Sequence, residues 1–205
     1  MFIFPVGEKN PSESLYSVLC SECRDRCFYL LEVSVSDWNR QLSPWPASSP
    51  HDFAGCGLQF LYLIKDRILI DVLNSGDYSD IKDFAIIGYS LAGLFSLWAL
   101  YNSDIFSAAA SCSGSLWYDG FTDYMASHSV RSRSCVYLSL GAKEEKTKNP
   151  VFSTIGNKTQ IAADILRNDP NITSSTYVLN PGGHHTDVEK RISSAVKWCL
   201  DNFHN

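Results

Sequence analysis

Short apolar segments recur along the chain with the composition of buried β-strands. They are rich in β-branched and aromatic residues and are separated by longer stretches of different periodicity. The strands that this pattern predicts are 2–6, 27–35, 84–88, 107–113, 136–140 and 176–179. Segment 84–88 is apolar at nearly every position, as expected where helices cover both faces of a parallel sheet.

Between the predicted strands, apolar residues return every three or four positions, the period of an amphipathic helix. The predicted helices are 12–23, opened by Pro11 and Ser12, then about 57–73, 91–101, a short one between 120 and 128, 159–167 and 188–202. Strands that alternate with helices imply right-handed crossovers. The sequence therefore predicts one domain over 1–205, a three-layer α/β/α sandwich with a mostly parallel sheet of about six strands.

Composition excludes several classes of function. The 205 residues carry a net charge of −5, and the one cluster of basic residues, 143–148, is mixed with acidic ones, so nucleic acid is not an expected partner. The apolar runs are far shorter than the ~20 residues of a membrane span. The first residues lack a basic region before the apolar stretch, which breaks at Pro5, so we expect a strand there and not a signal peptide. A cytoplasmic location is therefore expected.

Seven cysteines, an odd number in a chain without an export signal, indicate reduced thiols. Cys20, Cys23 and Cys27 fall at i, i+3 and i+7 in line with Tyr16 and Leu19, which predicts the buried stripe of a helix. The alternative is a metal site, but three neighbouring thiolates are one short of a closed zinc site. No metal or other cofactor is expected.

The segment GYSLAG, residues 88–93, differs by one residue from the G-x-S-x-G nucleophile elbow. Ser90 stands between a predicted strand and a predicted helix, the context in which such a turn exposes a nucleophile. Ala92 replaces the second glycine and adds one methyl group, which we expect the turn to accommodate. The N–H of Leu91 would stabilise an oxyanion, and a second donor is expected in the loop after the first strand, at Val6, Gly7 or Glu8, with Gly7 preferred.

A serine nucleophile needs a base, and after such an elbow the acid and then the histidine follow along the chain. The loop after the last predicted strand contains two histidines behind a pair of glycines. We favour His184, which directly follows the glycines, over His185. The alternative for both is a solvated surface loop.

The acid is expected after the fifth predicted strand. There we favour Glu144 over Glu145, although a solvated charge run would explain the same residues. Asp119 and Asp123, after the fourth predicted strand, are weaker candidates.

Aromatic residues follow the second and fourth predicted strands and would overhang Ser90. Trp38, Trp45, Trp117 and Tyr118 are therefore predicted to form a mostly apolar substrate pocket. The alternative is that these aromatic residues only pack the loops against the core. Because no cap domain is visible, the site is expected to be open.

Four segments carry a resemblance that covers most of the chain: GYSLAGLFSLWALY, SCSGSLWYDGF, YLSLGAKEEKTKNP and NPGGHHTDVEKRISSAVKWCL. In order and spacing the chain resembles the α/β-hydrolase superfamily, in the esterase branch of enterochelin esterase-like and esterase D-like proteins. The resemblance implies Ser90 as nucleophile, His184 as base, an acid in GAKEE and hydrolysis of acyl esters. Two features depart from it: no HGGG-type oxyanion motif is present, and the sheet looks trimmed, beginning at the family's third strand.

These observations favour a serine hydrolase that cleaves a small-molecule carboxylic ester through an acyl-enzyme with a Ser-His-Glu triad. One alternative is thioesterase or other acyl-transfer chemistry on the same triad. Another is a hydrolase-like binding protein without catalysis, which Ala92 and the missing HGGG motif would explain.

Overall fold

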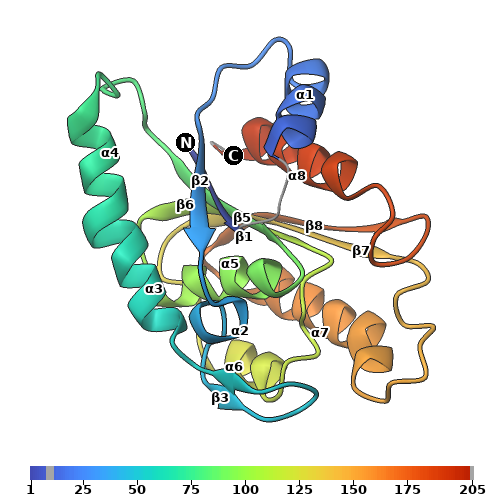
Figure 1. Cartoon of the computed structure of the whole chain (residues 1–205). Coiled ribbons are helices and arrows are strands. Elements are labelled where there is room, and N and C mark those ends of the chain that lie inside the picture. The colour runs from blue at the N-terminus through green and yellow to red at the C-terminus, as the bar shows by residue number, and fades with distance from the viewer. Residues whose placement is uncertain (8–11, 204–205) are drawn as a thin grey trace.

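Six parallel strands form the central sheet (Figure 1). The computed structural model describes residues 1–7 and 12–203. In spatial order the strands are β2 (Leu30–Val35), β1 (Phe2–Gly7), β5 (Phe84–Tyr89), β6 (Phe106–Cys112), β7 (Ser134–Gly141) and β8 (Ile172–Asn180). Each neighbouring pair runs parallel, which confirms the predicted parallel sheet of about six strands.

Helices cover both faces of the sheet and complete the predicted three layers. Figure 1 shows α1 and α8 on one face, with α5 and α7 on the other. The bounds are α1 (Ser12–Glu22), α5 (Leu91–Asn102), α6 (Phe121–Ser127), the 3₁₀-helix η2 (Phe152–Thr154), α7 (Ile155–Asn168) and α8 (Val188–Asn202). The Pro11 expected to open the first helix lies outside the described residues.

The central strands β1 and β5 are apolar along nearly their whole length because both of their faces are buried. Successive residues of a strand point to opposite sides. Ile3 and Ile86 belong to the core cluster that includes α5 and α7, whereas Phe2, Phe4 and Ile87 belong to the cluster that includes α1 and α8. The sheet is therefore held between two hydrophobic cores.

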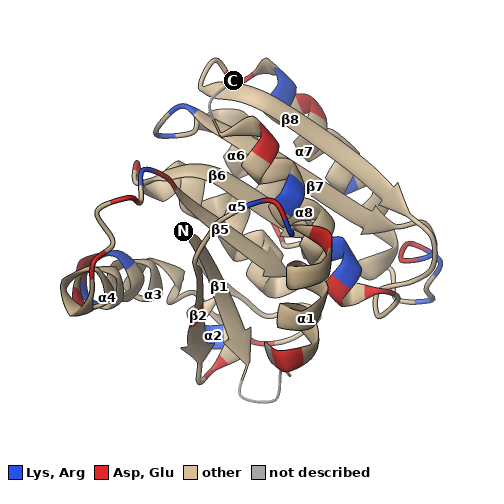
Figure 2. Ribbon diagram, turned by 90° about the horizontal axis from the view of Figure 1, so that it is seen from above, with Lys and Arg blue, Asp and Glu red and all other residues tan. Residues whose placement is uncertain are grey.

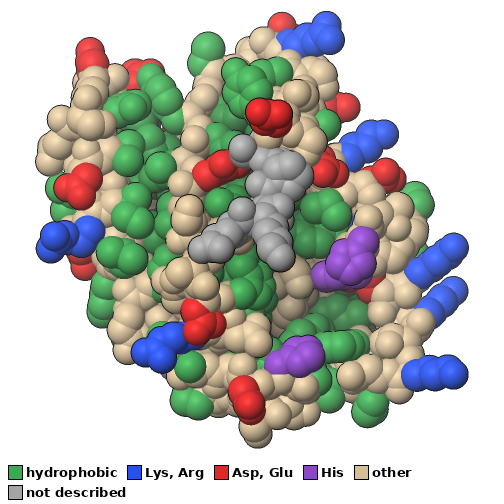
Figure 3. Space-filling model, viewed as in Figure 1, with side chains coloured by type: hydrophobic (Ala, Val, Ile, Leu, Met, Phe, Trp, Pro, Cys, Tyr) green, Lys and Arg blue, Asp and Glu red, His purple; other side chains and the backbone are tan. Residues whose placement is uncertain are grey.

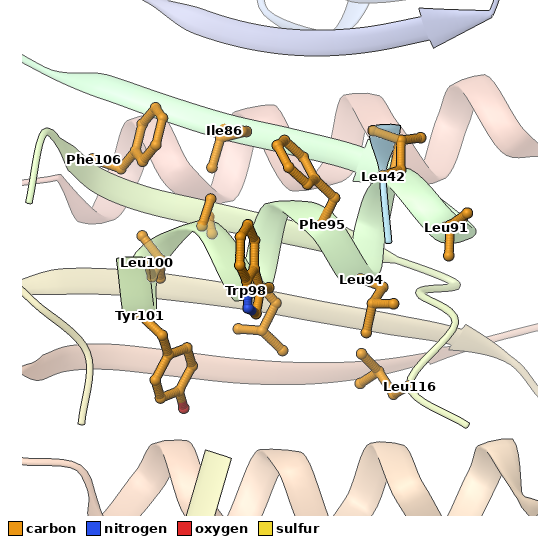
Figure 4. Packing of buried hydrophobic residues seen from close by; sticks show 14 of the residues in the cluster. Leu42, Ile86, Leu91, Leu94, Phe95, Trp98, Leu100, Tyr101, Phe106 and Leu116 are labelled. Atoms are coloured by element: carbon orange, nitrogen blue, oxygen red, sulfur yellow. The ribbon is translucent and has the colours of Figure 1, made fainter. Parts of the chain in front are cut away.

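Helix α5 is buried on all sides, which fixes the position of the residue that precedes it. Every side chain from Leu91 to Tyr101 is buried, and the helix contains no charged residue. Figure 4 shows how Phe95 and Trp98 of α5 pack in one cluster with Ile86 of the sheet. A helix that is apolar all round is stable only inside a core.

Two predicted segments contain elements that the hydrophobic period did not predict. The loop predicted over 36–53 contains a short helix and a small antiparallel hairpin: α2 (Trp38–Gln41), β3 (Pro46–Ala47) and β4 (Phe53–Ala54). The helix predicted over about 57–73 is continuous but includes a π-helical turn, as α3 (Gly57–Leu63), η1 (Ile64–Ile68) and α4 (Leu69–Ser75). The strands β3 and β4 have two residues each, and such short elements leave no hydrophobic period in the sequence.

The buried stripe predicted through three cysteines is wrong for two of them. Leu19 and Cys23 are buried, whereas Tyr16 and Cys20 are exposed and Cys27 lies exposed beyond the end of α1. The buried face follows i, i+4 spacing, so residues one turn apart but offset by a position fall on the solvent side. All seven cysteines carry free thiols, and the described residues contain no cluster of side chains that could hold a metal ion.

Most charged residues lie in loops and in helices at the outside of the fold (Figure 2). The central elements β5, α5 and β6 contain none. No helix in the described part of the chain has both the length and the apolar character needed to cross a bilayer.

Parallel pairing places the carboxyl ends of all six strands at one rim of the sheet. The chain order reverses between the adjacent strands β1 and β5, and such a switch point is where open α/β sheets bind ligands. Ser90 follows β5, Glu144 follows β7 and His184 follows β8. The fold thus brings three distant segments to the same edge.

Candidate active site

Ser90 lies in a strained turn between β5 and α5, with φ 59° and ψ −122°. A Cβ at Gly88 would lie 2.2 Å from the carbonyl oxygen of Ala92 and 2.8 Å from its Cβ. Strand and helix therefore approach so closely that only glycine fits at position 88. The methyl group of Ala92 fits because Gly88 has no side chain, so the elbow exists with alanine in the second position.

His184 bridges Ser90 and Glu144. Its Nε2 lies 3.1 Å from Ser90 Oγ, and its Nδ1 lies 2.7 Å from Glu144 Oε2. An ionised carboxylate only accepts hydrogen bonds, so Nδ1 carries the proton and Nε2 is left as the acceptor that faces the serine hydroxyl. The structure thus brings together the three residues predicted as nucleophile, base and acid.

The alternative residues lie elsewhere. His185 is exposed, with its ring 5.0 Å from that of His184. The Glu145 carboxylate lies against Gly156 in α7, since a Cβ built on that glycine would lie 2.1 Å from Oε2. Asp119 and Asp123 are exposed and do not line the cavity beside Ser90.

Glu144 is held by several donors besides His184. Its Oε1 accepts hydrogen bonds from Ser113 Oγ at 2.7 Å, from the Gly141 N–H at 2.6 Å and from Arg191 Nη1 at 3.1 Å. Burial raises the pKa of this carboxyl, but the hydrogen bonds from His184, Ser113 and Gly141 outweigh it and the net pKa is lowered. Glu144 therefore stays ionised and keeps its orientation.

Arg191 lies beneath the site and is only 2% exposed. Its Nη2 donates to the carbonyls of Pro181 at 3.0 Å and Gly183 at 2.9 Å, and its Nη1 lies 3.1 Å from the Tyr89 hydroxyl. Tyr89 in turn donates to the carbonyl of His184 at 2.6 Å, and burial raises the pKa of this phenol, which keeps the proton on it. Arg191 and Tyr89 together fix the loop that carries the imidazole.

Sequence reasoning missed Arg191, Tyr89 and Ser113. A single arginine on an amphipathic helix is usually a surface charge. One signal was present, because Arg191 stands at i relative to Ala195 at i+4 and Cys199 at i+8, both on the buried face of α8. A charge in register with a buried stripe indicates a buried ion pair.

The predicted oxyanion donors lie near the serine to different degrees. Leu91 is the first residue of α5, so its N–H has no acceptor within the helix, and the residue lines the cavity. Gly7 is the last residue of β1, and a Cβ built on it would lie 3.7 Å from the indole ring of Trp38. Gly7 is not among the residues that line the cavity. Glu8 lies outside the described residues. The roles of Leu91 and Gly7 stay predictions.

A cavity of about 470 Å³ opens at Ser90, within the size range of small-molecule sites. Of the predicted pocket residues, Trp38 and Trp117 line it. Further lining residues that sequence reasoning did not assign to it are Asn39, His51, Phe53, Ser113, Ser115, Lys143, Lys146, Thr147, Phe152 and Ile155.

Trp45 and Tyr118, also predicted as pocket residues, do not line this cavity, so that prediction is wrong for both. Trp45 Nε1 donates to the carbonyl of Asp119 at 3.0 Å, and the Tyr118 hydroxyl donates to the carbonyl of Trp45. Their ring centroids are 5.8 Å apart, and Tyr118 is 1% exposed. Each ring is thus bound to the other's loop, and the pair packs the loops against the core.

No protein-family model matches the sequence, and a search of curated proteins finds no relative. Solved structures do share the fold. The siderophore hydrolase EstA from Aspergillus nidulans is 14% identical, with a TM-score of 0.71 over 98% of this chain and 82% of that one. An IroE-like serine hydrolase from Shewanella oneidensis is 13% identical, with a TM-score of 0.74 over 96% and 69%.

The enterobactin hydrolase IroE in complex with DFP is 17% identical, with a TM-score of 0.68 over 100% of this chain and 82% of that one. At such identities the likeness shows the fold alone. The chain has the α/β-hydrolase fold that the sequence resemblance implied.

Proposed function

We propose that this protein is a serine hydrolase that cleaves carboxylic esters through an acyl-enzyme. The observation that carries the proposal is the position of His184, with one ring nitrogen 3.1 Å from Ser90 Oγ and the other 2.7 Å from Glu144 Oε2. This is the arrangement in which an imidazole activates a hydroxyl while a carboxylate orients the imidazole. The names of several structural neighbours, as siderophore hydrolases or serine hydrolases, support ester hydrolysis in general.

In the first half-reaction Ser90 Oγ attacks the ester carbonyl carbon while His184 Nε2 takes the hydroxyl proton. The tetrahedral intermediate carries its negative charge on the former carbonyl oxygen, where the N–H groups of Leu91 and Gly7 would stabilise it; one such donor is worth about 2.7–4 kcal/mol. As the intermediate collapses, the bond to the alkoxy oxygen breaks and the imidazolium gives its proton to the departing alcohol.

In the second half-reaction a water molecule attacks the acyl-enzyme while His184 takes one of its protons. The new tetrahedral intermediate releases the carboxylic acid, and His184 passes the proton taken from water to Ser90 Oγ. Glu144 stays ionised throughout, keeps the proton on Nδ1 and stabilises the imidazolium in both steps.

The test is the substitution Ser90→Ala, measured with short 4-nitrophenyl esters. We expect kcat to fall by at least about 10³-fold, because removal of a triad member leaves only binding and oxyanion stabilisation. The matched control is Ser194→Ala, which removes an exposed hydroxyl on α8 and should leave the rate as in the parent protein. An unchanged rate in Ser90→Ala would refute the proposal.

Covalent labelling with a fluorophosphonate gives a second, independent measurement. An activated serine reacts with this probe, and labelling should disappear in Ser90→Ala but persist in Ser194→Ala. If the folded parent protein does not label, the site lacks an activated serine and a non-catalytic binding role replaces the proposed hydrolase.

A further inference from the structure

Two lysines line the cavity on the side of the loop that follows β7. Lys143 and Lys146 both belong to the cavity wall, together with Thr147. In the described ranges, neither ammonium group has a carboxylate within 4.0 Å, since the ion pairs there involve other residues. Among the described residues, the cavity wall therefore carries two cations without a carboxylate partner.

The nearby acids do not offset this charge. Glu144 is the one carboxylate among the described residues that line the cavity, and its oxygens are bound by His184, Ser113 and Arg191. The Glu145 carboxylate lies against Gly156, and Glu145 is not among the residues that line the cavity. A local positive excess thus stands at the site of a chain whose net charge is −5.

The space-filling view shows the same asymmetry. Lys and Arg side chains project together along the margin where Figure 1 draws the loop after β7, close to a histidine at the surface (Figure 3). The acidic side chains on this face lie mostly elsewhere. A cleft with cations along one wall concentrates anions by focusing the electrostatic field.

Another part of the cavity wall is aromatic. Trp117 lies edge-on to Phe152, with ring centroids 5.0 Å apart, and Phe53 lies 6.2 Å from Trp117. The ring of His51 lies 6.3 Å from those of Phe53 and Phe152. Such a wall binds hydrocarbon and excludes water, which strengthens a charge contact at the edge of the same cavity.

We propose that the natural substrate is an ester that carries a carboxylate in addition to the scissile bond. The apolar part of the substrate packs against Trp117 and Phe152, and the carboxylate binds beside Lys143 and Lys146. This inference rests on the proposed function, because it names the substrate class of the same site.

Two matched pairs of substrates test it. Mono-(4-nitrophenyl) adipate and its neutral methyl ester place the charge on the acyl side; 3-carboxyphenyl butyrate and 3-carbamoylphenyl butyrate place it on the alcohol side. In one of the pairs we expect kcat/KM to favour the anionic ester by about tenfold, the size expected of two partly solvated charge contacts. High salt should reduce this preference.

The substitutions Lys143→Gln and Lys146→Gln identify the source of the preference. We expect the double variant to lower the ratio of anionic to neutral kcat/KM to about two or less. Each single variant should give a ratio between those of the parent protein and the double variant. The matched control is Lys148→Gln, which removes the same charge from the same loop outside the cavity wall and should keep the ratio of the parent protein. Using a ratio removes any general loss of activity from the comparison.

The outcomes separate this inference from the proposed function. If the parent protein hydrolyses the neutral esters without preference in either pair, or if the double variant keeps the preference, this inference is wrong and the hydrolase proposal stands. Hydrolysis of none of the four esters by a protein that still labels at Ser90 also overturns this inference alone. No hydrolysis and no labelling overturn both.

Discussion

Arg191 and Glu144 form a buried ion pair, with Nη1 3.1 Å from Oε1 and the two side chains 2% and 5% exposed. The same guanidinium binds the carbonyls of Pro181 and Gly183, which precede His184. One side chain of α8 therefore holds both the proposed acid and the loop of the proposed base. The planar guanidinium provides donors in several directions, which a lysine ammonium cannot reproduce in the same geometry.

We predict that Arg191→Met lowers both stability and kcat. Breaking a buried pair from one side costs about 3–5 kcal/mol, because the partner charge is left without its counterion. Arg191→Lys should recover part of the stability but less of kcat, since a single Nζ cannot reproduce the separate positions of Nη1 at Glu144 and Nη2 at the two carbonyls. Thermal unfolding and ester kinetics measure the two effects. The neighbouring exposed Lys190→Met is the control, and equal losses there would contradict the positioning role.

Glu144→Gln should lower kcat by about 10²- to 10⁴-fold, because an amide in place of the carboxylate no longer fixes the tautomer with the proton on Nδ1. Glu145→Gln, which removes the adjacent carboxylate that lies against Gly156, should stay within about twofold of the parent protein, as for an ordinary surface substitution. Steady-state kinetics on one neutral ester decide between them. Similar losses in the two variants would exclude Glu144 as the specific partner of His184.

The lowered pKa of Glu144 predicts a pH dependence of stability. A carboxyl whose pKa is lower in the folded than in the unfolded state contributes stability above the unfolded value, here 4.5, and loses it as the pH falls through the folded value. The difference in Tm between the parent protein and Glu144→Gln should therefore narrow from about pH 6 to about pH 3. Circular dichroism melts across this range provide the measurement. A difference that widens in acid would show the opposite sign.

Gly88→Ala should destabilise the fold, because its Cβ would lie 2.2 Å from a backbone oxygen that cannot move aside cheaply. Overpacking of this kind costs about 1–3 kcal/mol or more. At Gly183 a Cβ meets nothing within 4 Å, so Gly183→Ala is the matched control and should be close to neutral. Urea denaturation gives the free energies of unfolding. A stable Gly88→Ala would mean that strand and helix separate more easily than the packing indicates.

The sheet and the positions of Ser90, Glu144 and His184 could be predicted because they follow from two regular features. Hydrophobic period identifies the strands, and parallel pairing brings the ends of those strands to one rim whatever the loops do. Each of the three residues lies within a few positions of a strand end. A residue so close in sequence to the end of a rigid strand can occupy few positions in space, so its place at the rim follows from the strand assignment.

The cavity wall could not be predicted to the same degree. Trp38 and Trp45 lie in one loop, yet the short helix α2 presents Trp38 to the cavity while a hydrogen bond to the Asp119 carbonyl holds Trp45 elsewhere. Which aromatic ring faces a ligand depends on such single bonds, and these have no periodic signature. The same holds for Arg191, whose partners lie in β5 and in the loops that follow β6, β7 and β8.

The packing at Gly88 and Ala92 bears on how related sequences are recognised. The tight steric constraint falls on the strand side of the turn, so the helix side accepts one carbon atom more than the usual consensus permits. A search pattern that demands glycine at both flanks would produce a false negative on this chain. A pattern relaxed at the downstream flank alone would match this chain.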